Sequence, residues 1–143
     1  MESELADFAE AIVGVGYELR RLIDGDVVQL TAQEAQVMRH IDQHPGVTPS
    51  DVARATGLQR SNLSTALRTL DRRGFVDRRT DPHDARGINL FPTDRAADNL
   101  ARLRRQWAGH IASALGGEMQ GVPAAKALLE RLEAALVAER LDG

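Results

Sequence analysis

The sequence has 143 residues, enough for one domain with its own core, and its 43% hydrophobic but only 3% aromatic content favours packed helices over a β-sandwich. There is no cysteine, which excludes disulfides, thiolate metal sites and thiol-based redox sensing. The net charge of −3 would alone argue against a nucleic-acid partner, and the lack of a long apolar run or a basic leader predicts a cytoplasmic protein.

The first predicted helix carries apolar residues that recur every three or four positions, and it breaks at Asp24-Gly25-Asp26. A seam this regular needs a surface to pack against, either the core of its own subunit or a second subunit. Both alternatives stay open at this point. The seam consists of Leu5, Phe8, Ile12, Val15, Leu19 and Leu22.

The second predicted helix opens with a capping box, in which Thr31 is the cap and Glu34 follows three residues later. It continues through an apolar set and ends near His44-Pro45-Gly46. We expect this helix to pack behind the elements that follow. Its apolar set is Val37, Met38 and Ile41.

A short third helix is predicted from the cap Thr48, with Pro49 in its first turn and a stop at Gly57. Gly57 would allow a tight turn into the next helix, as in a helix-turn-helix. The residues expected to be buried here are Val52, Ala53 and Leu58.

The fourth predicted helix, residues 59–73, has one apolar and one polar face. The polar face carries hydroxyls, amides and arginines, with Asp71 expected toward the buried side. Such side chains suit base and phosphate contacts in a DNA major groove, although an ordinary solvated helix face is the alternative. The apolar stripe is Leu63, Ala66, Leu67 and Leu70, and the polar face is Ser61, Thr65, Arg68 and Arg72, with Asn62, Ser64 and Thr69 at its edges.

Two short strands are predicted next, residues 75–79 and 88–91, joined by a polar loop over residues 80–87. Near the tip of this hairpin, Arg86 could enter a narrow A·T minor groove, held in place by an aspartate of the same loop. The competing interpretation is a metal site, which is weak because the loop supplies few ligands. Its ligands would be Asp81, His83 and Asp84.

Two further helices are predicted, one from Arg95 to a stop at Gly116-Gly117 and one from Pro123 onward. Both repeat apolar residues at helical spacing, like the first helix. A small winged module cannot bury three such seams alone, so we expect a homodimer. The apolar residues are Leu100, Leu103, Trp107 and Ile111 in one helix, and Leu128, Leu129, Leu132, Ala135, Leu136 and Leu141 in the other.

Charge is unevenly distributed along the chain. The segment from Arg54 to Arg86 contains eight arginines and four aspartates, which gives it a charge of +4. Since the whole chain has a net charge of −3, the remaining residues carry −7. A basic module on an acidic body is expected when one face meets phosphate. No nucleophile–base pair or phosphate-binding glycine loop is found, so we predict neither an enzyme nor a resident cofactor or metal.

The segment from Gln59 to Gly87 resembles the recognition helix and wing of the multiple-antibiotic-resistance regulator (MarR) family. The helix exit Leu70-Asp71-Arg72-Arg73-Gly74-Phe75-Val76-Asp77-Arg78 is similar to that family's pattern, as are Asp81, Asp84 and Arg86 in the wing. The resemblance implies a mainly α fold with a small β-hairpin wing, a winged helix-turn-helix. It implies one domain over residues 1–143, with a DNA-binding module over 31–92 and dimerisation helices over 1–24 and 95–143.

By this resemblance the protein would be a ligand-responsive homodimeric transcription regulator that acts as a repressor on a pseudo-palindromic double-stranded DNA operator. A small aromatic or acidic effector would bind between the dimer helices and the winged module. The alternative is a winged-helix module that binds a protein instead of DNA. The expected DNA-binding residues are Thr48, Ser50, Arg60, Ser61, Asn62, Ser64, Thr65, Arg68, Arg72, Asp84 and Arg86, and the expected effector-binding residues are Tyr17, Arg20, His40, Trp107 and His110.

Overall fold

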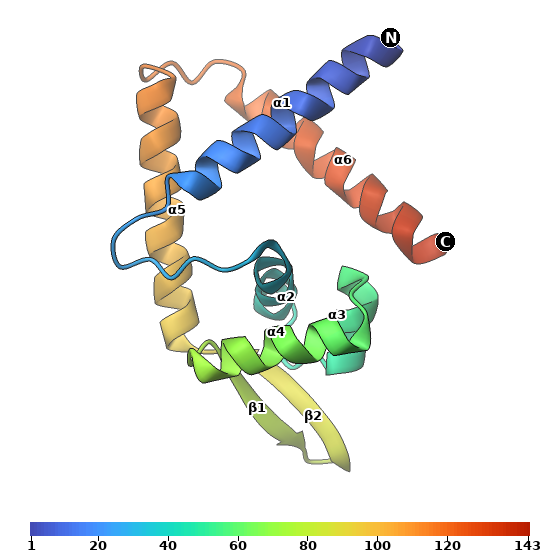
Figure 1. Cartoon of the computed structure of the whole chain (residues 1–143). Coiled ribbons are helices and arrows are strands. Elements are labelled where there is room, and N and C mark those ends of the chain that lie inside the picture. The colour runs from blue at the N-terminus through green and yellow to red at the C-terminus, as the bar shows by residue number, and fades with distance from the viewer. The chain divides into compact units, whose positions relative to one another are not determined.

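The computed structural model describes all 143 residues, except for the side chains of Ala85 and Arg86. The elements are α1 (Glu2–Arg21), α2 (Ala32–Gln43), α3 (Pro49–Thr56), α4 (Arg60–Arg72), β1 (Val76–Asp81), β2 (Asp84–Pro92), α5 (Asp94–Ala114) and α6 (Val122–Asp142), as labelled in Figure 1. The predicted fold class, mainly α with a β-hairpin wing, is confirmed. Within the described part of the chain, no helix combines the length and apolar character that crossing a membrane requires.

The chain divides into two compact units. The first consists of Met1–Gln29 and Asn99–Met119, and the second of Leu30–Asp98 and Gln120–Gly143. Helix α5 therefore begins in the second unit and continues into the first.

In the first unit, two side chains of α5 hold the segment that follows α1. Asn99 accepts a hydrogen bond from the Val28 amide (2.8 Å) and donates to the Val28 carbonyl (3.1 Å). Gln106 pairs in the same way with the backbone of Asp24, at 3.2 and 2.8 Å. Because Asn99 and Gln106 lie seven residues apart, they share one face of α5. The link from α1 is thus held to α5 by polar side chains at two points.

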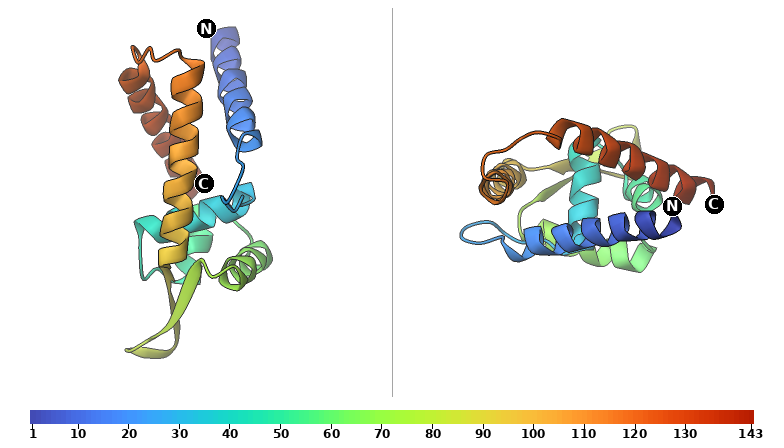
Figure 2. Two further views of the ribbon diagram at one scale, coloured as in Figure 1. Left: turned by 90° about the vertical axis from the view of Figure 1, so that its left-hand side faces the viewer. Right: turned by 90° about the horizontal axis from the view of Figure 1, so that it is seen from above.

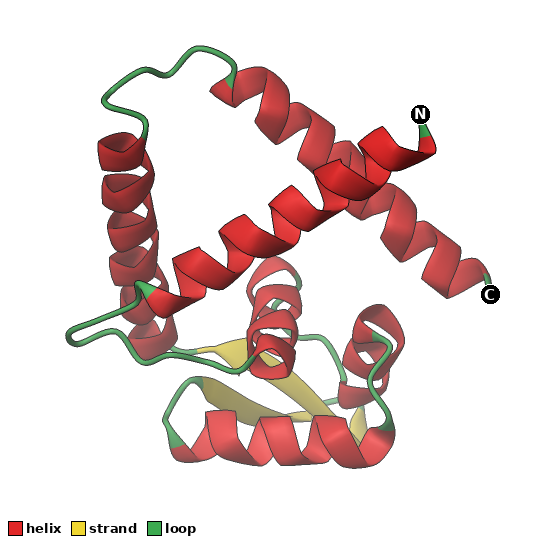
Figure 3. Cartoon of the chain, turned by 45° about the horizontal axis from the view of Figure 1, so that its top comes forward, coloured by secondary structure: helices red, strands yellow, loops and turns green.

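The second unit is built around one apolar core. Helices α2, α3 and α4 pack together, and the antiparallel hairpin β1–β2 joins them through an isolated bridge between Val47 and Leu90. Figure 3 shows α4 and the strands on neighbouring sides of α2 and α3. Burial of these side chains from water is the main stabilising term of this unit. The fully buried side chains are Val37, Ile41, Val52, Leu70, Phe75 and Leu90.

Helix boundaries follow the predicted capping residues closely. The Thr31 hydroxyl accepts a hydrogen bond from the Glu34 amide (3.2 Å), and the Thr48 hydroxyl accepts one from the Asp51 amide (3.2 Å). Helix α3 ends at Gly57, whose φ of 73° is favourable for glycine. Of the residues expected to be buried here, Val52 is fully buried, while Ala53 and Leu58 are half-buried.

The hairpin differs from the sequence prediction, because its strands are longer and its loop shorter. Most residues of the loop expected over 80–87 belong to β1 or β2, and only Pro82 and His83 connect the strands. The ladder continues because its register shifts between Thr80 and Asp81, and because the Asp81 carboxylate accepts a hydrogen bond from the His83 amide (2.8 Å). An exposed polar ribbon shows no apolar alternation, so its strands resemble a loop in the sequence.

Candidate nucleic-acid interface

Helix α4 separates its apolar and polar side chains as the sequence predicted. Its four apolar residues are buried, while its hydroxyl, amide and arginine side chains are exposed to solvent, apart from half-buried Thr69. Burial of the apolar stripe fixes the rotation of the helix, so the polar face points outward. The exposed set includes Arg60, Ser61, Asn62, Ser64, Thr65, Arg68 and Arg72.

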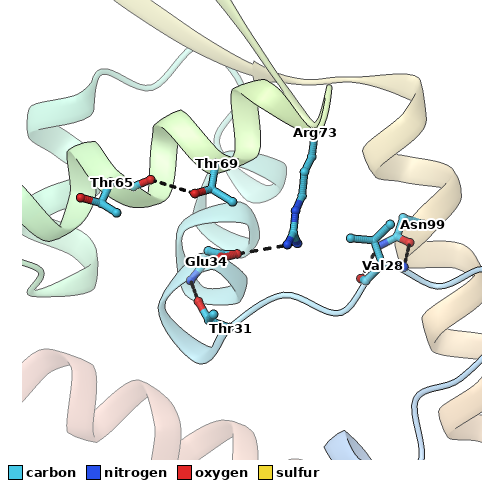
Figure 4. Close-up of polar contacts among 7 residues, drawn as sticks. All are labelled: Val28, Thr31, Glu34, Thr65, Thr69, Arg73 and Asn99. Atoms are coloured by element: carbon cyan, nitrogen blue, oxygen red, sulfur yellow. Dashed lines mark hydrogen bonds and ion pairs between the residues drawn. The ribbon is translucent and has the colours of Figure 1, made fainter.

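Hydrogen bonds order the middle of this polar face. The Thr65 hydroxyl donates to the Ser61 carbonyl (3.0 Å), and the Thr69 hydroxyl donates to the Thr65 carbonyl (3.2 Å; Figure 4). Arg68 donates to the Thr65 hydroxyl (3.3 Å). This contact uses one donor of a guanidinium that has five, so Arg68 keeps donors for a base edge or a phosphate.

The N-terminus of α4 is open to an anion. Its cap residue, Gln59, makes no side-chain capping bond, and its first turn contains no acidic residue. The first amides of the helix therefore have no side-chain acceptor, and the helix dipole adds positive potential there. Exposed Arg60 and Asn62 flank this end. Together they can bind a phosphate of a nucleic-acid backbone.

The other end of α4 is tied to α2 through a partly buried carboxylate. Arg73, the C-cap of α4, lies 4.0 Å from the carboxylate of Glu34, which is only 8% exposed (Figure 4). A charge so deeply buried needs a nearby partner of opposite sign. Asp71, expected toward the buried side, is instead exposed, because it projects from the last turn of α4, just before the chain turns away at Gly74.

The start of α3 combines a capped N-terminus with an ion pair. Arg54 donates to the Asp51 carboxylate (2.9 Å). A hydrogen bond with the Thr48 side chain, followed by the Arg54 contacts, holds the pKa of Asp51 below its ordinary value. Ser50 is exposed beside this cap and Thr48 is half-buried. Any phosphate that approaches here meets a carboxylate whose charge Arg54 partly offsets.

The wing presents two further arginines. Arg79 lies over the ring of Phe91, 4.1 Å from its centroid, and donates to the Asp77 carboxylate (3.1 Å). Arg78, on the opposite face of the strand, is exposed. The side chain of Arg86, expected at the tip, lies outside the described residues. In Figure 2 the hairpin extends away from the helices of its unit.

The tip of the wing is tightly built, and a glycine makes this possible. A Cβ atom on Gly87 would lie 3.1 Å from the Cβ of Asp81 and 3.3 Å from the Asp84 carbonyl oxygen.

Among the described side chains, no cluster of three or more histidine, aspartate or glutamate residues is arranged to hold a metal ion.

The residues expected to bind an effector fall into different units. Tyr17, Arg20, Trp107 and His110 belong to the first unit, and His40 belongs to the second. In the first unit the Trp107 indole donates to the Leu19 carbonyl (3.3 Å), while Tyr17 is 66% exposed.

The sequence interpretation missed a histidine pair on α2. His40 and His44 lie one helical turn apart, with stacked rings whose centroids are 4.4 Å apart, and His44 Nδ1 lies 3.2 Å from the His40 carbonyl. Their spacing of four residues is the signal that could have revealed them. Both line a groove of about 360 Å³ within the second unit, between α2, α3 and α6.

Comparisons with known proteins agree with this geometry. The family model that matches is described as MarR family and covers residues 28–87. The fold is similar to that of a protein of Pseudomonas aeruginosa that has been assigned as a transcriptional regulator, with a TM-score of 0.77 and 28% identity over 92% of this chain and 94% of that one. It is also similar to the transcriptional repressor CouR bound to a 23-mer DNA duplex, with a TM-score of 0.71 and 28% identity over 91% of this chain and 89% of that one.

A third similar structure is the PcaV transcriptional regulator of Streptomyces coelicolor in complex with its natural ligand. Its TM-score is 0.61 and its identity 25%, over 90% of this chain and 89% of that one. Among curated proteins, none matches the chain.

Proposed function

Because this chain belongs to the MarR family of winged helix-turn-helix transcription regulators, we propose that it acts as a homodimeric, ligand-responsive repressor on a pseudo-palindromic DNA operator. Two copies would place their α4 helices in successive major grooves about 10 base pairs apart. Family members are non-enzymatic, which confirms the expectation that the chain is not an enzyme. A regulator that works on an operator acts where the DNA lies, so a cytoplasmic location remains part of this proposal.

The observation that carries the proposal is the exposed face of α4. It combines short hydroxyls and amides with arginines, and it leads from an uncapped, acid-free N-terminus. We assign Arg68, whose guanidinium donates to Thr65, to a base edge, and Arg72, which is closer to the helix end, to a backbone phosphate. We assign the expected contacts Thr48 and Ser50 at α3 to phosphate positioning. In the wing we assign Arg86 to the minor groove and Asp84 to holding that arginine in place.

Homodimer formation is supported by the apolar side chains of the terminal helices. No residue of α1 is buried, and Leu5 and Val15 are 62% and 58% exposed. Helix α6 likewise has no buried residue, and its Leu136 is 56% exposed. Large apolar surfaces of this kind are typical of protein–protein contacts. Since a pseudo-palindrome requires two recognition helices, a second copy of this chain is the simplest partner.

Effector binding is the part of the proposal that rests most on similar proteins, because PcaV is known in complex with its natural ligand. In this chain the aromatic and basic side chains suited to an aromatic or acidic ligand are Tyr17, Arg20, His40, Trp107 and His110. The second candidate function, a winged-helix module that binds a protein, is favoured only by the exposed arginines of the wing.

The proposal is tested by fluorescence anisotropy on a labelled fragment of the DNA upstream of the protein's own gene, at two salt concentrations. We expect tight, salt-sensitive and sequence-selective binding, which Arg68→Ala should weaken by about 1–3 kcal/mol and make less selective. Arg105→Ala, which changes an exposed arginine of α5 outside the winged module, is the matched control and should bind as the unaltered protein does. Equal affinity for unrelated duplexes, or no effect of Arg68→Ala, would favour the protein-binding module.

A further inference from the structure

The C-terminal end of α6 makes direct contact with the first helix of the helix-turn-helix. Arg140 donates from one guanidinium nitrogen to the Arg54 carbonyl (3.3 Å) and from another to the Ala55 carbonyl. Both acceptors lie in the last turn of α3, where carbonyls have no partner within the helix. A cation at the C-terminus of a helix also interacts favourably with its dipole. Arg140 thus completes the end of α3 although it lies 86 and 85 positions from its two acceptors in the sequence.

The turn after α3 is shaped to receive this arginine. A Cβ atom on Gly57 would lie 2.9 Å from an Nη atom and 3.0 Å from the Cδ atom of Arg140. These distances are shorter than van der Waals contact, so a side chain at this position would displace the guanidinium. Gly57 therefore serves two purposes, the positive φ of 73° and the space for Arg140.

A second contact holds α6 to α2. The guanidinium of Arg39 donates to both oxygens of the Glu133 carboxylate, one of them at 2.9 Å. The two-point geometry fixes the orientation of both side chains. Both remain about half exposed, so the pair adds little stability by itself. It lies along the same side of α6 as Arg140, seven residues earlier, and both line the groove between α2, α3 and α6.

We propose that Arg140, assisted by the Arg39–Glu133 pair, is a positioning residue for DNA binding: α6 fixes the last turn of α3 and, through it, the start of α4. This inference rests on the proposed function. Arg140 itself is not assigned to the DNA-contacting face. Figure 1 shows the C-terminal end of α6 next to α3, with α4 following directly along the chain.

The short length of α3 explains why such support matters. Helix α3 has eight residues, of which Val52 alone is buried, and a helix this short is marginal without tertiary contacts. Only Gly57, Leu58 and Gln59 separate it from α4. A shift of the last turn of α3 is therefore passed to Arg60 and its neighbours, which we assign to DNA. Since α6 also carries exposed apolar residues proposed to face a second subunit, the contact links the arrangement of the dimer to the helix-turn-helix.

The experiment compares Arg140→Gln with Arg131→Gln. Arg131 is an exposed arginine of the same helix that makes no hydrogen bond or ion pair with the residues described, so both variants lose one charge from α6. Hydrogen exchange of the free protein should be roughly tenfold faster at the amides of Ala55, Thr56 and Gly57 in Arg140→Gln alone. Operator affinity should fall with an unchanged salt slope, because no phosphate contact is lost. Arg140→Lys, which keeps one charged donor, should restore part of both effects.

Three results would overturn the inference. The first is unchanged exchange at the end of α3 in Arg140→Gln. The second is a salt slope reduced by about 1, which would make Arg140 a phosphate contact. The third is that Arg140→Gln elutes as a monomer in size-exclusion chromatography while the unaltered protein elutes as a dimer, which would place Arg140 at the subunit contact.

The exchange measurement needs no DNA, so it judges the inference separately from the proposed function. If Arg68→Ala also leaves operator binding unchanged, the proposed function fails, while the exchange result still decides the role of Arg140. For the second contact, Glu133→Arg should accelerate hydrogen exchange at the same amides, and adding Arg39→Glu should restore their protection by re-forming the ion pair with reversed charges. If the charge-reversed pair does not restore protection, Arg39 and Glu133 are removed from the inference.

Discussion

Helices α4 and α1 are both amphipathic, but they differ in what happens to their apolar side. Helix α4 buries its whole apolar stripe in the second unit and exposes only polar and charged side chains. Helix α1 is longer, yet none of its 20 residues is buried. Its exposed face includes Leu5, Phe8, Ile12 and Val15.

This difference separates two kinds of amphipathic pattern. In α4 the apolar side chains are buried within the chain, so the exposed polar side chains are the ones that can bind a ligand. In α1 the apolar side chains stay exposed within the chain, so they form the surface on which a partner can pack. The two helices together support the proposal that the chain completes its winged module alone, whereas a second copy would cover its terminal helices.

The same substitution, leucine to alanine, should therefore destabilise the subunit strongly in α4 and hardly at all in α1. Leu70→Ala removes a fully buried side chain of α4 and should lower the free energy of unfolding by about 2–5 kcal/mol, because it leaves a cavity. Leu5→Ala should change the stability of the subunit by less than about 0.5 kcal/mol. Urea denaturation monitored by circular dichroism measures both, at a protein concentration low enough to separate the subunits. Similar losses for the two variants would contradict the comparison.

Deletion of residues 1–24 should remove the subunit contact while leaving the winged module folded. We expect a monomer, or an aggregate if the remaining apolar seams of α5 and α6 associate without order. Sedimentation velocity over a range of concentrations distinguishes these from a dimer. Circular dichroism confirms that the module remains helical. A clean dimer from the truncated chain would move the interface away from α1.

Local signals made most of the fold predictable. The caps Thr31 and Thr48, the stop at Gly57 and the three- and four-residue spacing of the buried leucines in α4 each act within one or two helical turns. Such short-range rules place α2, α3 and α4 within one or two residues of their observed ends. The polar face of α4 follows directly, because the buried stripe determines which side chains remain outside.

Features that depend on contacts distant in sequence could not be predicted. The contact of Arg140 with α3 and the ion pair of Glu133 with Arg39 join residues that are 85 to 94 positions apart, and no local sequence pattern indicates them. The wing strands were underestimated, because a polar ribbon exposed on both faces lacks the alternation that identifies a strand. Asp71 was misplaced because helical angle alone does not show where neighbouring elements end.

Alanine substitutions of three arginines in the polar face of α4 and in the wing should weaken DNA binding in three different ways. Arg68→Ala should weaken the preferred operator by about 1–3 kcal/mol and relax its sequence preference. Arg72→Ala should weaken all sequences alike and reduce the salt slope by about 1. Arg86→Ala should weaken A·T-flanked sites most. Anisotropy titrations over several salt concentrations and operator variants measure these effects, and identical behaviour of all three variants would contradict the assigned roles.

The smallest effect expected concerns His40, in the groove between α2, α3 and α6. Burial lowers its pKa below the ordinary 6.5, the charge of His44 lowers it further, and Asp51 partly opposes both. As pH falls through 6.5, the unfolded chain binds a proton at this residue before the folded one does, so the free energy of unfolding decreases. His40→Gln should flatten this dependence between pH 7.5 and about 5.5, whereas His83→Gln on the hairpin turn should not. An equal flattening by both variants would show that loss of any histidine suffices. A selective one would assign the pH dependence to the groove where α6 meets the helix-turn-helix.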